Sequence, residues 1–204
     1  SFMDEARANQ LGLAPLQGEL ERVAAIRNRA QLVDYLARAQ VLSVPNPIGA
    51  GIYADAKRPD VNTLYADQSG LGLPEREYYL SDDARFKEIR AAYLKHIEKL
   101  FALAGRKDGA RVAQRVMAFE TRLAKADVGK VYNPYDVAGA EKLTPGLDWS
   151  TWLAGMGAAS HDQIIVGQPS YFKELGKAMG DVPLATWKDY LTLRVIDTFS
   201  PYLG

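Results

Sequence analysis

The chain has 204 residues, and its 25 lysine and arginine side chains balance its 25 aspartate and glutamate side chains, which excludes a strong attraction to nucleic acid or anionic membranes. Hydrophobic residues make up 48% of the sequence, enough for a substantial core, and the absence of cysteine excludes disulfides, thiolate metal sites and cysteine nucleophiles. No apolar run approaches the roughly 20 residues that cross a bilayer as a helix, and the first residues lack the features of a signal peptide.

The first part of the chain predicts two helices and then a hairpin. Turn residues at 12–15 separate a short amphipathic opening from Leu16 to Ala39, where aliphatic residues recur at helical spacing. Between Val44 and Gln68, prolines and glycines exclude a helix, while β-branched and aromatic residues favour extended chain. The turn residues 57–60 therefore predict a small β-hairpin within this segment.

An antiparallel pair of helices is predicted next. Ser81 is the expected N-cap of the first helix, with Asp82 and Asp83 favourable in its first turn, and Gly105 is expected to end it. A short connection around residues 106–109 leads to the second helix. Each helix has one apolar stripe, and the facing stripes are expected to form the main core: Phe86, Ile89, Tyr93, Leu94, Ile97, Leu100 and Phe101, then Val112, Val116, Phe119 and Leu123.

The last third of the chain predicts shorter elements and one long helix. Asn133-Pro134 and Asp148-Trp149 are typical of helix starts, and residues 163–166 form a short extended run closed by residues 167–169. A final helix is expected from Pro183 toward Ser200. The predicted fold class is therefore mainly α, a multi-helix domain with a small β-hairpin near residues 44–68.

The histidines do not form a zinc-binding pair. Only His96 and His161 occur, and a His-Glu-x-x-His helix needs two imidazoles one turn apart. Four residues after His96 stands Leu100, and four residues after His161 stands Ile165. We therefore expect a structural role for both histidines.

Three further patterns match known sites in their letters only. Ser160-His161-Asp162 has the residue types of a hydrolytic triad, but neighbouring residues point their side chains apart. Residues 49–54 fit a variant of the dinucleotide-binding fingerprint without the required preceding strand and following helix. Residues 70–74 lack the lysine of a phosphate-binding loop, so their glycines are expected to permit tight turns, with Leu71 and Leu73 packed inward.

The remaining candidates are also interpreted as structural. The pair Asp82 and Asp83 fits the electrostatics of a helix start, and Trp149, Trp152 and Trp187 are expected in the core. The residues therefore predict no catalytic, cofactor-binding or metal-binding residue in this chain. They leave the substrate-binding residues undetermined.

A series of motifs nevertheless resembles one enzyme family. The segment Asp67-Gln68-Ser69-Gly70-Leu71-Gly72-Leu73-Pro74-Glu75-Arg76-Glu77-Tyr78-Tyr79-Leu80 is similar to a landmark of the neprilysin family of zinc metalloendopeptidases. Further motifs occur along the whole chain in the same order as in the family. They are Val116 to Glu120 with Leu123-Ala124, Tyr132-Asn133-Pro134, Leu147-Asp148-Trp149, Gln168-Pro169 with Tyr171, and Trp187, Tyr190, Leu191 and Arg194.

The resemblance implies a function that the residues of this chain do not indicate by themselves. Residues 1–204 would be part of the N-terminal helical cap region, which closes a chamber and admits only small peptides, while the catalytic zinc domain is absent from this chain. Zinc would be bound in that missing half, which would also be the chain's partner, and oligopeptides would be the substrates. This fragment alone is expected to be inactive. The alternative is a stand-alone helical module that binds a peptide or a protein.

The resemblance also implies a cellular location, and the sequence differs from the family pattern at two places. Members without cysteine are expected to be bacterial and extracytoplasmic, that is secreted, periplasmic or surface-anchored. Glu77 stands where the family more often has aspartate, a change that keeps the charge. Between Ala126 and Asp127 relatives usually have an additional polar segment. Either this loop was deleted from the protein or it is absent only from the given sequence, and we expect the second, because exposed polar loops are often disordered.

Overall fold

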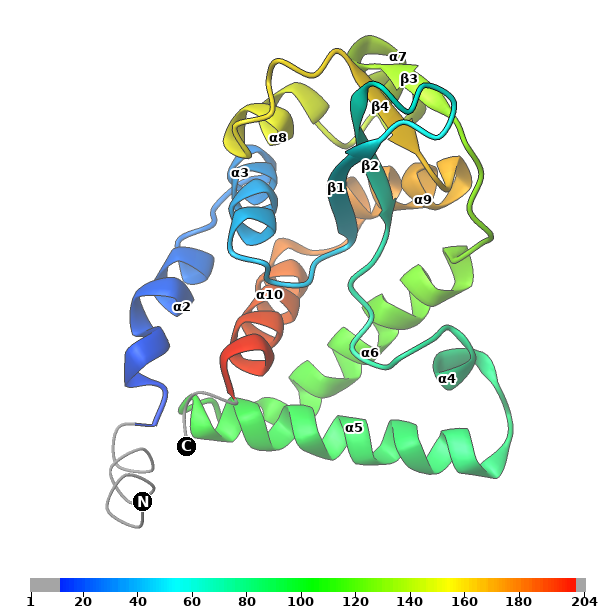
Figure 1. The fold of residues 1–204 in the computed structure, drawn as a ribbon. Helices are drawn as coiled ribbons and strands as arrows, with labels where there is room; N and C mark the ends of the chain where they lie inside the picture. The colour runs from blue at the N-terminus through cyan, green and yellow to red at the C-terminus, as the bar shows by residue number, and fades with distance from the viewer. Residues whose placement is uncertain (1–11, 201–204) are drawn as a thin grey trace, which may run out of the picture.

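The computed structural model describes residues 12–200, so the predicted opening helix before Gly12 lies outside the described residues. Figure 1 shows the order of its helices and strands. Helices dominate, which confirms the prediction of a mainly α fold. The elements are η1 (Ala14–Leu16), α2 (Gln17–Ala24), α3 (Arg29–Val41), β1 (Ile48–Ala54), β2 (Asn62–Gln68), α4 (Glu77–Leu80), α5 (Ala84–Leu103), α6 (Gly109–Ala126), β3 (Pro134–Asp136), α7 (Val137–Leu143), α8 (Trp149–Gly155), β4 (Gln163–Val166), α9 (Pro169–Asp181) and α10 (Leu184–Phe199).

The predicted hairpin is present and forms one side of a four-stranded sheet. β1 pairs antiparallel with β2, from Ile48 opposite Gln68 to Ala54 opposite Asn62. β2 also pairs in parallel with β4, the extended run expected at residues 163–166, and β4 pairs antiparallel with β3. The strand order is therefore β1-β2-β4-β3, and the sheet joins segments that lie far apart in the sequence.

The side chain of Asp55 organises the hairpin turn. It accepts hydrogen bonds from the backbone N–H groups of Lys57 (2.8 Å) and Arg58 (3.1 Å), and from the hydroxyl groups of Thr63 (3.2 Å) and Tyr132 (2.8 Å). Burial acts to raise the pKa of Asp55, but these hydrogen bonds to the carboxylate outweigh it and the pKa is lowered. The turn is thus held by an ionised carboxylate.

α5 and α6 form the predicted antiparallel pair. Gly105 adopts a φ of 79°, a left-handed conformation that ends α5 as expected. The expected N-cap is wrong, because Asp83 and not Ser81 precedes the helix, and its side chain accepts the N–H of Arg85 at 2.8 Å. Ser81 follows the short helix α4 instead. Both residue types favour helix starts, and the residue adjacent to the first turn is the one that caps it.

The single helix expected over Leu16 to Ala39 is wrong. α2 ends at Ala24, and α3 begins at Arg29. Asn28 has an extended backbone, and its side chain accepts the N–H of Gln31 at 2.9 Å, so it starts a new helix. The apolar spacing continues across this break because Ile26 is buried in the same core as the helices on either side.

The helix start expected at Asn133-Pro134 is also wrong. Pro134 begins β3, because the carbonyl of Asn133 accepts the N–H of Val166 at 2.8 Å and draws this segment into the sheet. Asp148 is the N-cap of α8, as predicted, and its side chain accepts the N–H of Thr151 at 3.0 Å. The final helix is confirmed as α10, whereas α9 was not anticipated from the sequence.

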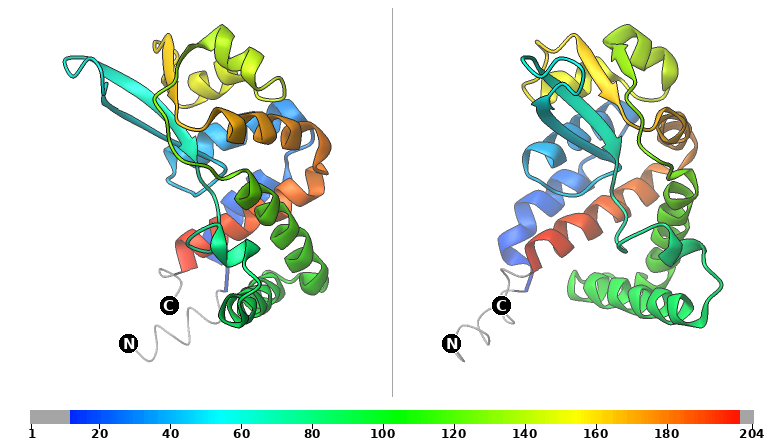
Figure 2. Two further views of the ribbon diagram at one scale, coloured as in Figure 1. Left: turned by 90° about the vertical axis from the view of Figure 1, so that its right-hand side faces the viewer. Right: turned by 45° about the vertical axis from the view of Figure 1, so that its right-hand side comes forward.

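The core extends well beyond the facing stripes of α5 and α6. Trp149, Trp152 and Trp187 are fully buried, which confirms the interpretation of the tryptophans. The rings of Trp149 and Trp152 pack edge to face with their centroids 5.4 Å apart, and the rings of Trp187 and Phe119 of α6 have centroids 4.7 Å apart. Figure 2 shows the helices that surround this core and the hairpin that projects away from them.

Asp127 follows the end of α6 directly. Its N–H donates to the carbonyl of Ala124 at 3.2 Å, and its side chain contacts the side chain of Gln68 at the end of β2. The additional segment that relatives are expected to carry between Ala126 and Asp127 stays a prediction.

Candidate functional site

The two histidines lie in different parts of the fold. His96 is on α5, and its Nε2 is 2.9 Å from Oδ1 of Asp197 on α10. His161 lies in the loop after α8, where its N–H donates to the carbonyl of Ala158. Within residues 12–200, no three histidine, aspartate or glutamate side chains are grouped so that they could hold a metal ion. The described residues therefore do not provide a zinc site.

The other two sequence patterns lie in local structures that do not form the sites their residue types suggest. Ser160-His161-Asp162 is part of a turn, so its side chains do not converge. Residues 49–54 lie in β1, which runs into the hairpin turn and not into a helix. A dinucleotide phosphate would therefore meet no helix N-terminus here.

The glycine loop, residues 69–74, is held to the core by tyrosine hydroxyl groups. The carbonyl of Gly70 accepts the hydroxyl of Tyr190 at 2.6 Å, and the carbonyl of Ser69 accepts the hydroxyl of Tyr171 at 3.2 Å. Gly70 has a φ of 89°, and a side chain there would strike the hydroxyl of Tyr190. Leu71 and Leu73 pack against the core, as predicted. The glycines permit this close approach and form no phosphate cradle.

Beneath the glycine loop lies a buried polar cluster, which we call the Glu120 cluster: Glu120, Tyr79, Tyr93 and Arg194. Glu120 is fully buried on α6 and accepts the hydroxyl groups of Tyr79 and Tyr93, each at 3.0 Å. Arg194 donates to the hydroxyl of Tyr93 at 2.8 Å and lies 3.7 Å from the carboxylate. The N–H of Leu73 donates to the hydroxyl of Tyr79 at 2.8 Å and connects the loop to the cluster.

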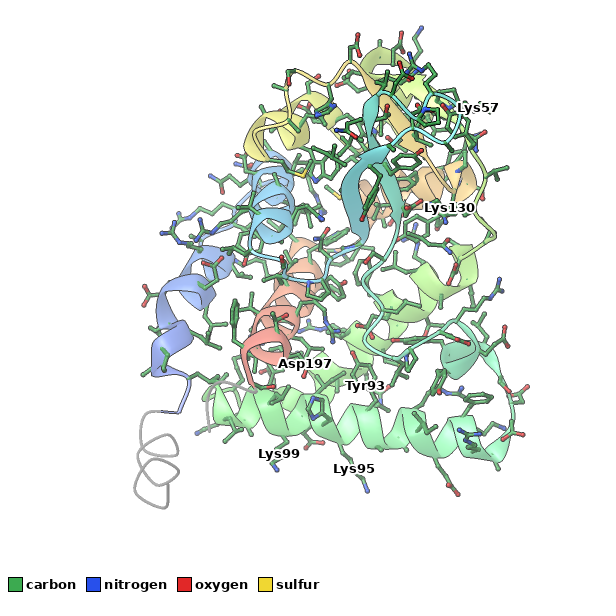
Figure 3. The ribbon with its side chains drawn as sticks, viewed as in Figure 1. Lys57, Tyr93, Lys95, Lys99, Lys130 and Asp197 are labelled. Atoms are coloured by element: carbon green, nitrogen blue, oxygen red, sulfur yellow. The ribbon has the colours of Figure 1, made fainter. Side chains whose placement is uncertain are left out.

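The hydrogen bonds of the cluster determine how its protons are arranged. The hydroxyl of Tyr79 accepts from Leu73, and the hydroxyl of Tyr93 accepts from Arg194, so both hydroxyl protons are directed at Glu120. Burial raises the pKa of Glu120, while Arg194 and the two hydroxyl groups act against it. Figure 3 shows Tyr93 on the inner side of α5, with Lys95 and Lys99 on the opposite side of the helix. The cluster is enclosed and serves to position α4, α5, α6 and α10.

A cavity of about 330 Å³ lies on the outer side of the glycine loop. Asp127 is its one carboxylate, and burial raises the pKa of that group. The other titratable group of the lining, Tyr171, uses its hydroxyl on the carbonyls of Pro47 and Ser69, so Asp127 has no second carboxylate or histidine beside it to act as its acid–base partner. The cavity can hold a small group, but it lacks the residues for catalysis. It is lined by Gln68, Ser69, Gly70, Leu71, Leu73, Pro74, Leu123, Asp127 and Tyr171.

Comparison with known families identifies the chain. The model for the N-terminal part of peptidase family M13 matches residues 1–204. This chain belongs to peptidase family M13. The resemblance to the neprilysin family that the motifs indicated is thereby confirmed.

Known relatives of the M13 chain are much longer than it is. Endothelin-converting enzyme-like 1 of Rattus norvegicus is 27% identical over 203 residues, which cover 93% of this chain and 26% of that protein. Endothelin-converting enzyme 1 of Homo sapiens is 24% identical, over 98% of this chain and 29% of its own length. The crystal structure of the zinc metalloprotease ZMP1 of Mycobacterium tuberculosis in complex with an inhibitor matches 99% of this chain and 32% of its own, with 29% identity and a TM-score of 0.89.

Residues from the first two and the last two of the motifs that indicated the M13 family meet in space at the glycine loop. The loop lies in the first motif, Glu120 in the second, and Tyr171, Tyr190 and Arg194 in the last ones. Sequence reasoning identified these residues as landmarks but did not identify the cluster that they build. The sequence places Tyr93 only in an apolar stripe, because helical spacing does not reveal which hydroxyl groups have a buried partner.

Proposed function

We propose that this chain is a helical cap segment of a zinc-dependent metalloendopeptidase that cleaves oligopeptides. The segment would shape and close the substrate chamber, and the zinc site and the catalytic residues would lie in another part of the polypeptide. That catalytic part would be the chain's partner, and oligopeptides would be the substrates of the whole enzyme.

One observation carries the proposal. The whole chain matches the M13 family, yet residues 12–200 contain no group of side chains that could hold a metal ion. The chain spans about a quarter to a third of the relatives named above, so a separate catalytic part is compatible with their length. A segment of a metalloprotease that lacks the metal site is suited to control of access.

The rigidity of the fold is consistent with a cap. A chamber selects substrates by size only if its wall keeps its shape when a peptide presses against it. The Glu120 cluster joins four helices and the glycine loop: the hydroxyl groups of Tyr79 and Tyr93 donate to the carboxylate, and they in turn accept from Leu73 and Arg194. Across the fold, Arg122 of α6 pairs with Glu174 and Asp181 of α9. A buried polar network whose members are all hydrogen-bonded makes the surrounding structure more rigid.

The test compares the purified chain with the full-length product of its natural gene. Both would be incubated with a quenched fluorescent oligopeptide and with a folded protein substrate, before and after chelation and after zinc is restored. We expect cleavage of the oligopeptide by the full-length protein alone, lost with the chelator and recovered with zinc. Chelator-sensitive cleavage by the purified chain would contradict the proposal, and inactivity of both would favour a stand-alone binding module.

The location of the parent protein is part of the proposal. We propose an extracytoplasmic enzyme, by analogy with its family. The helices within residues 12–200 are all too short or too polar to cross a membrane. Immunoblots of cytoplasmic, periplasmic, envelope and secreted fractions of the native organism would test the location, and recovery in the cytoplasmic fraction would contradict it.

A further inference from the structure

We propose that His96 is a pH-sensitive link between α5 and α10, which is stronger in weakly acidic solution and supports the Glu120 cluster. The proposal concerns contacts within this chain and does not rest on the cap function. It is carried by a path of contacts from His96 to the interior, by the charges along that path, and by the proton chemistry of imidazole.

Four side chains form a continuous path from the surface to the core. The Nε2 atom of His96 on α5 lies 2.9 Å from Oδ1 of Asp197 on α10. The Oδ2 atom of Asp197 lies 3.6 Å from Nη2 of Arg194. The same nitrogen lies 3.7 Å from Oε1 of Glu120 on α6. The exposed fractions of these side chains fall along the path, from 46% for His96 to 30%, 5% and 0%. Figure 3 shows Asp197 where the end of α10 approaches α5.

The path carries two carboxylates and one permanent positive charge. Glu120 accepts from two hydroxyl groups, as an ionised carboxylate does, and Asp197 is the second carboxylate. The guanidinium of Arg194 is shared by both. With a neutral imidazole, one negative charge is therefore left without a positive partner. A protonated His96 supplies that partner at hydrogen-bond distance, so the contact between α5 and α10 is stronger when the imidazole is charged.

At the exposed end of the path, His96 is the group that changes its charge in weakly acidic solution, because histidine gains its proton near pH 6.5. Within residues 12–200, no further ion pair reaches His96 or Asp197. The neighbours of His96 along α5 are exposed, and they are Lys95, Glu98 and Lys99. The hydroxyl groups that face the path stay neutral, because burial raises their pKa values: Tyr79 of α4, Tyr93 of α5 and Tyr190 of α10.

The charge of His96 also determines how Arg194 is shared. When the imidazole is neutral, Asp197 and Glu120 compete for the same guanidinium nitrogen. When it is protonated, it compensates part of the charge of Asp197, and Arg194 interacts more strongly with Glu120. The hydroxyl of Tyr79 donates to Glu120 and accepts an N–H of the glycine loop. Protonation at the surface therefore strengthens the attachment of the glycine loop.

The first test measures the Tm of the 204-residue chain and of His96→Gln at pH 5.5 and at pH 8, in buffers of equal ionic strength. Glutamine keeps a hydrogen-bond donor but cannot gain a charge. The loss of Tm should be larger at pH 5.5 than at pH 8 by about 1–4 °C, the size expected for a partly exposed ion pair. Because burial raises the pKa of Glu120, the two proteins are compared at the same pH, which isolates the contribution of His96.

His161→Gln is the matched control. The backbone N–H of His161 donates to Ala158, and no ion pair within the described residues reaches its side chain, so its effect on Tm should be equal at both pH values. In an Asp197→Asn background, the additional loss in His96→Gln at pH 5.5 should disappear, because the charge that attracts the imidazolium is gone. If Asp197→Asn does not fold, sodium chloride at about 1 M replaces it, since salt screens a partly exposed pair and should reduce the additional loss.

Hydrogen exchange tests the connection to the glycine loop. The N–H of Leu73 donates to the hydroxyl of Tyr79 at 2.8 Å. At pH 5.5 this amide should exchange about twofold to fivefold faster in His96→Gln than in the wild type. The amide of Asp55, which donates to the carbonyl of Val61 in the hairpin, is the reference and should exchange at the same rate in both proteins.

Two results would overturn the proposal. The first is a loss of Tm in His96→Gln that is equal at both pH values or larger at pH 8, since a charged imidazole would then not strengthen the contact. The second is exchange at Leu73 that does not change, or that changes only as much as exchange at Asp55, since the path would then not reach the glycine loop.

Discussion

Replacement of Tyr93 by phenylalanine isolates the contribution of the Glu120 cluster. The change keeps the buried ring and removes a hydroxyl that donates to Glu120 at 3.0 Å and accepts from Arg194 at 2.8 Å. Two hydrogen bonds to charged groups are lost, each contributing about 1.5–3 kcal/mol. At the lower end of that range, the free energy of unfolding should fall by about 3 kcal/mol. For a chain of this length, that corresponds to a decrease in Tm of about 6–12 °C.

Equilibrium unfolding in urea, followed by circular dichroism, would measure this change. Tyr53→Phe is the matched control, because the Tyr53 side chain is 62% exposed, and its effect should stay within about 0.5 kcal/mol. Tyr79→Phe and the double variant complete a cycle, in which we expect non-additivity above about 0.5 kcal/mol because both hydroxyl groups bind Glu120. A Tyr93→Phe protein as stable as the wild type would refute the assignment of a stabilising role to the cluster.

Three further predictions concern the loop, a helix cap and pH. Gly70→Ala should lower the free energy of unfolding by about 2 kcal/mol or more, because φ is 89° and the added carbon would strike the hydroxyl of Tyr190. Gly129→Ala, with nothing within 4 Å of the added carbon, is the control and should be neutral in urea unfolding. Asp148→Ala should cost about 1 kcal/mol by loss of the cap of α8, and a Tm equal to that of the wild type would contradict it. The N–H of Thr151 lowers the pKa of Asp148, and Arg38 lowers the pKa of Glu19. The pKa of each group is therefore lower in the folded protein than in the unfolded chain, where it is about 4. The stabilisation that these two carboxylates give the fold is complete above about pH 4 and is lost as the pH falls through the pKa values of the folded protein. Tm measured from pH 7 to pH 2 should therefore fall most steeply below about pH 4, and less steeply in Asp148→Asn, whose side chain caps without titrating.

Local signals were sufficient for several elements. The proline, glycine and β-branched residues between Val44 and Gln68 predicted the hairpin, and Gly105 and Asp148 marked helix boundaries correctly. Each of these signals acts through the backbone of its own segment. The family, likewise, followed from motifs that can be read in order along the chain.

The predictions of secondary structure were wrong where two local signals competed, or where pairing with a distant segment determined the structure. Ser81 and Asp83 can both cap a helix, and only the position of the first turn separates them. Asn133-Pro134 is compatible with a helix start, but pairing with β4 makes it a strand. The Glu120 cluster was inaccessible for the same reason, since Arg194 and Glu120 come together only when α6 and α10 pack.

The parallel pairing of β2 with β4 has a consequence for synthesis of the chain. β2 is complete at Gln68, whereas β4 begins only at Gln163. Ribosomes add about 5–20 residues per second, so several seconds pass before the strand that covers the inner edge of β2 exists. Throughout that interval the nascent hairpin has two open edges. Chaperone binding or aggregation of the nascent chain should therefore concentrate in this period, and pairing across so long a separation also makes refolding slow.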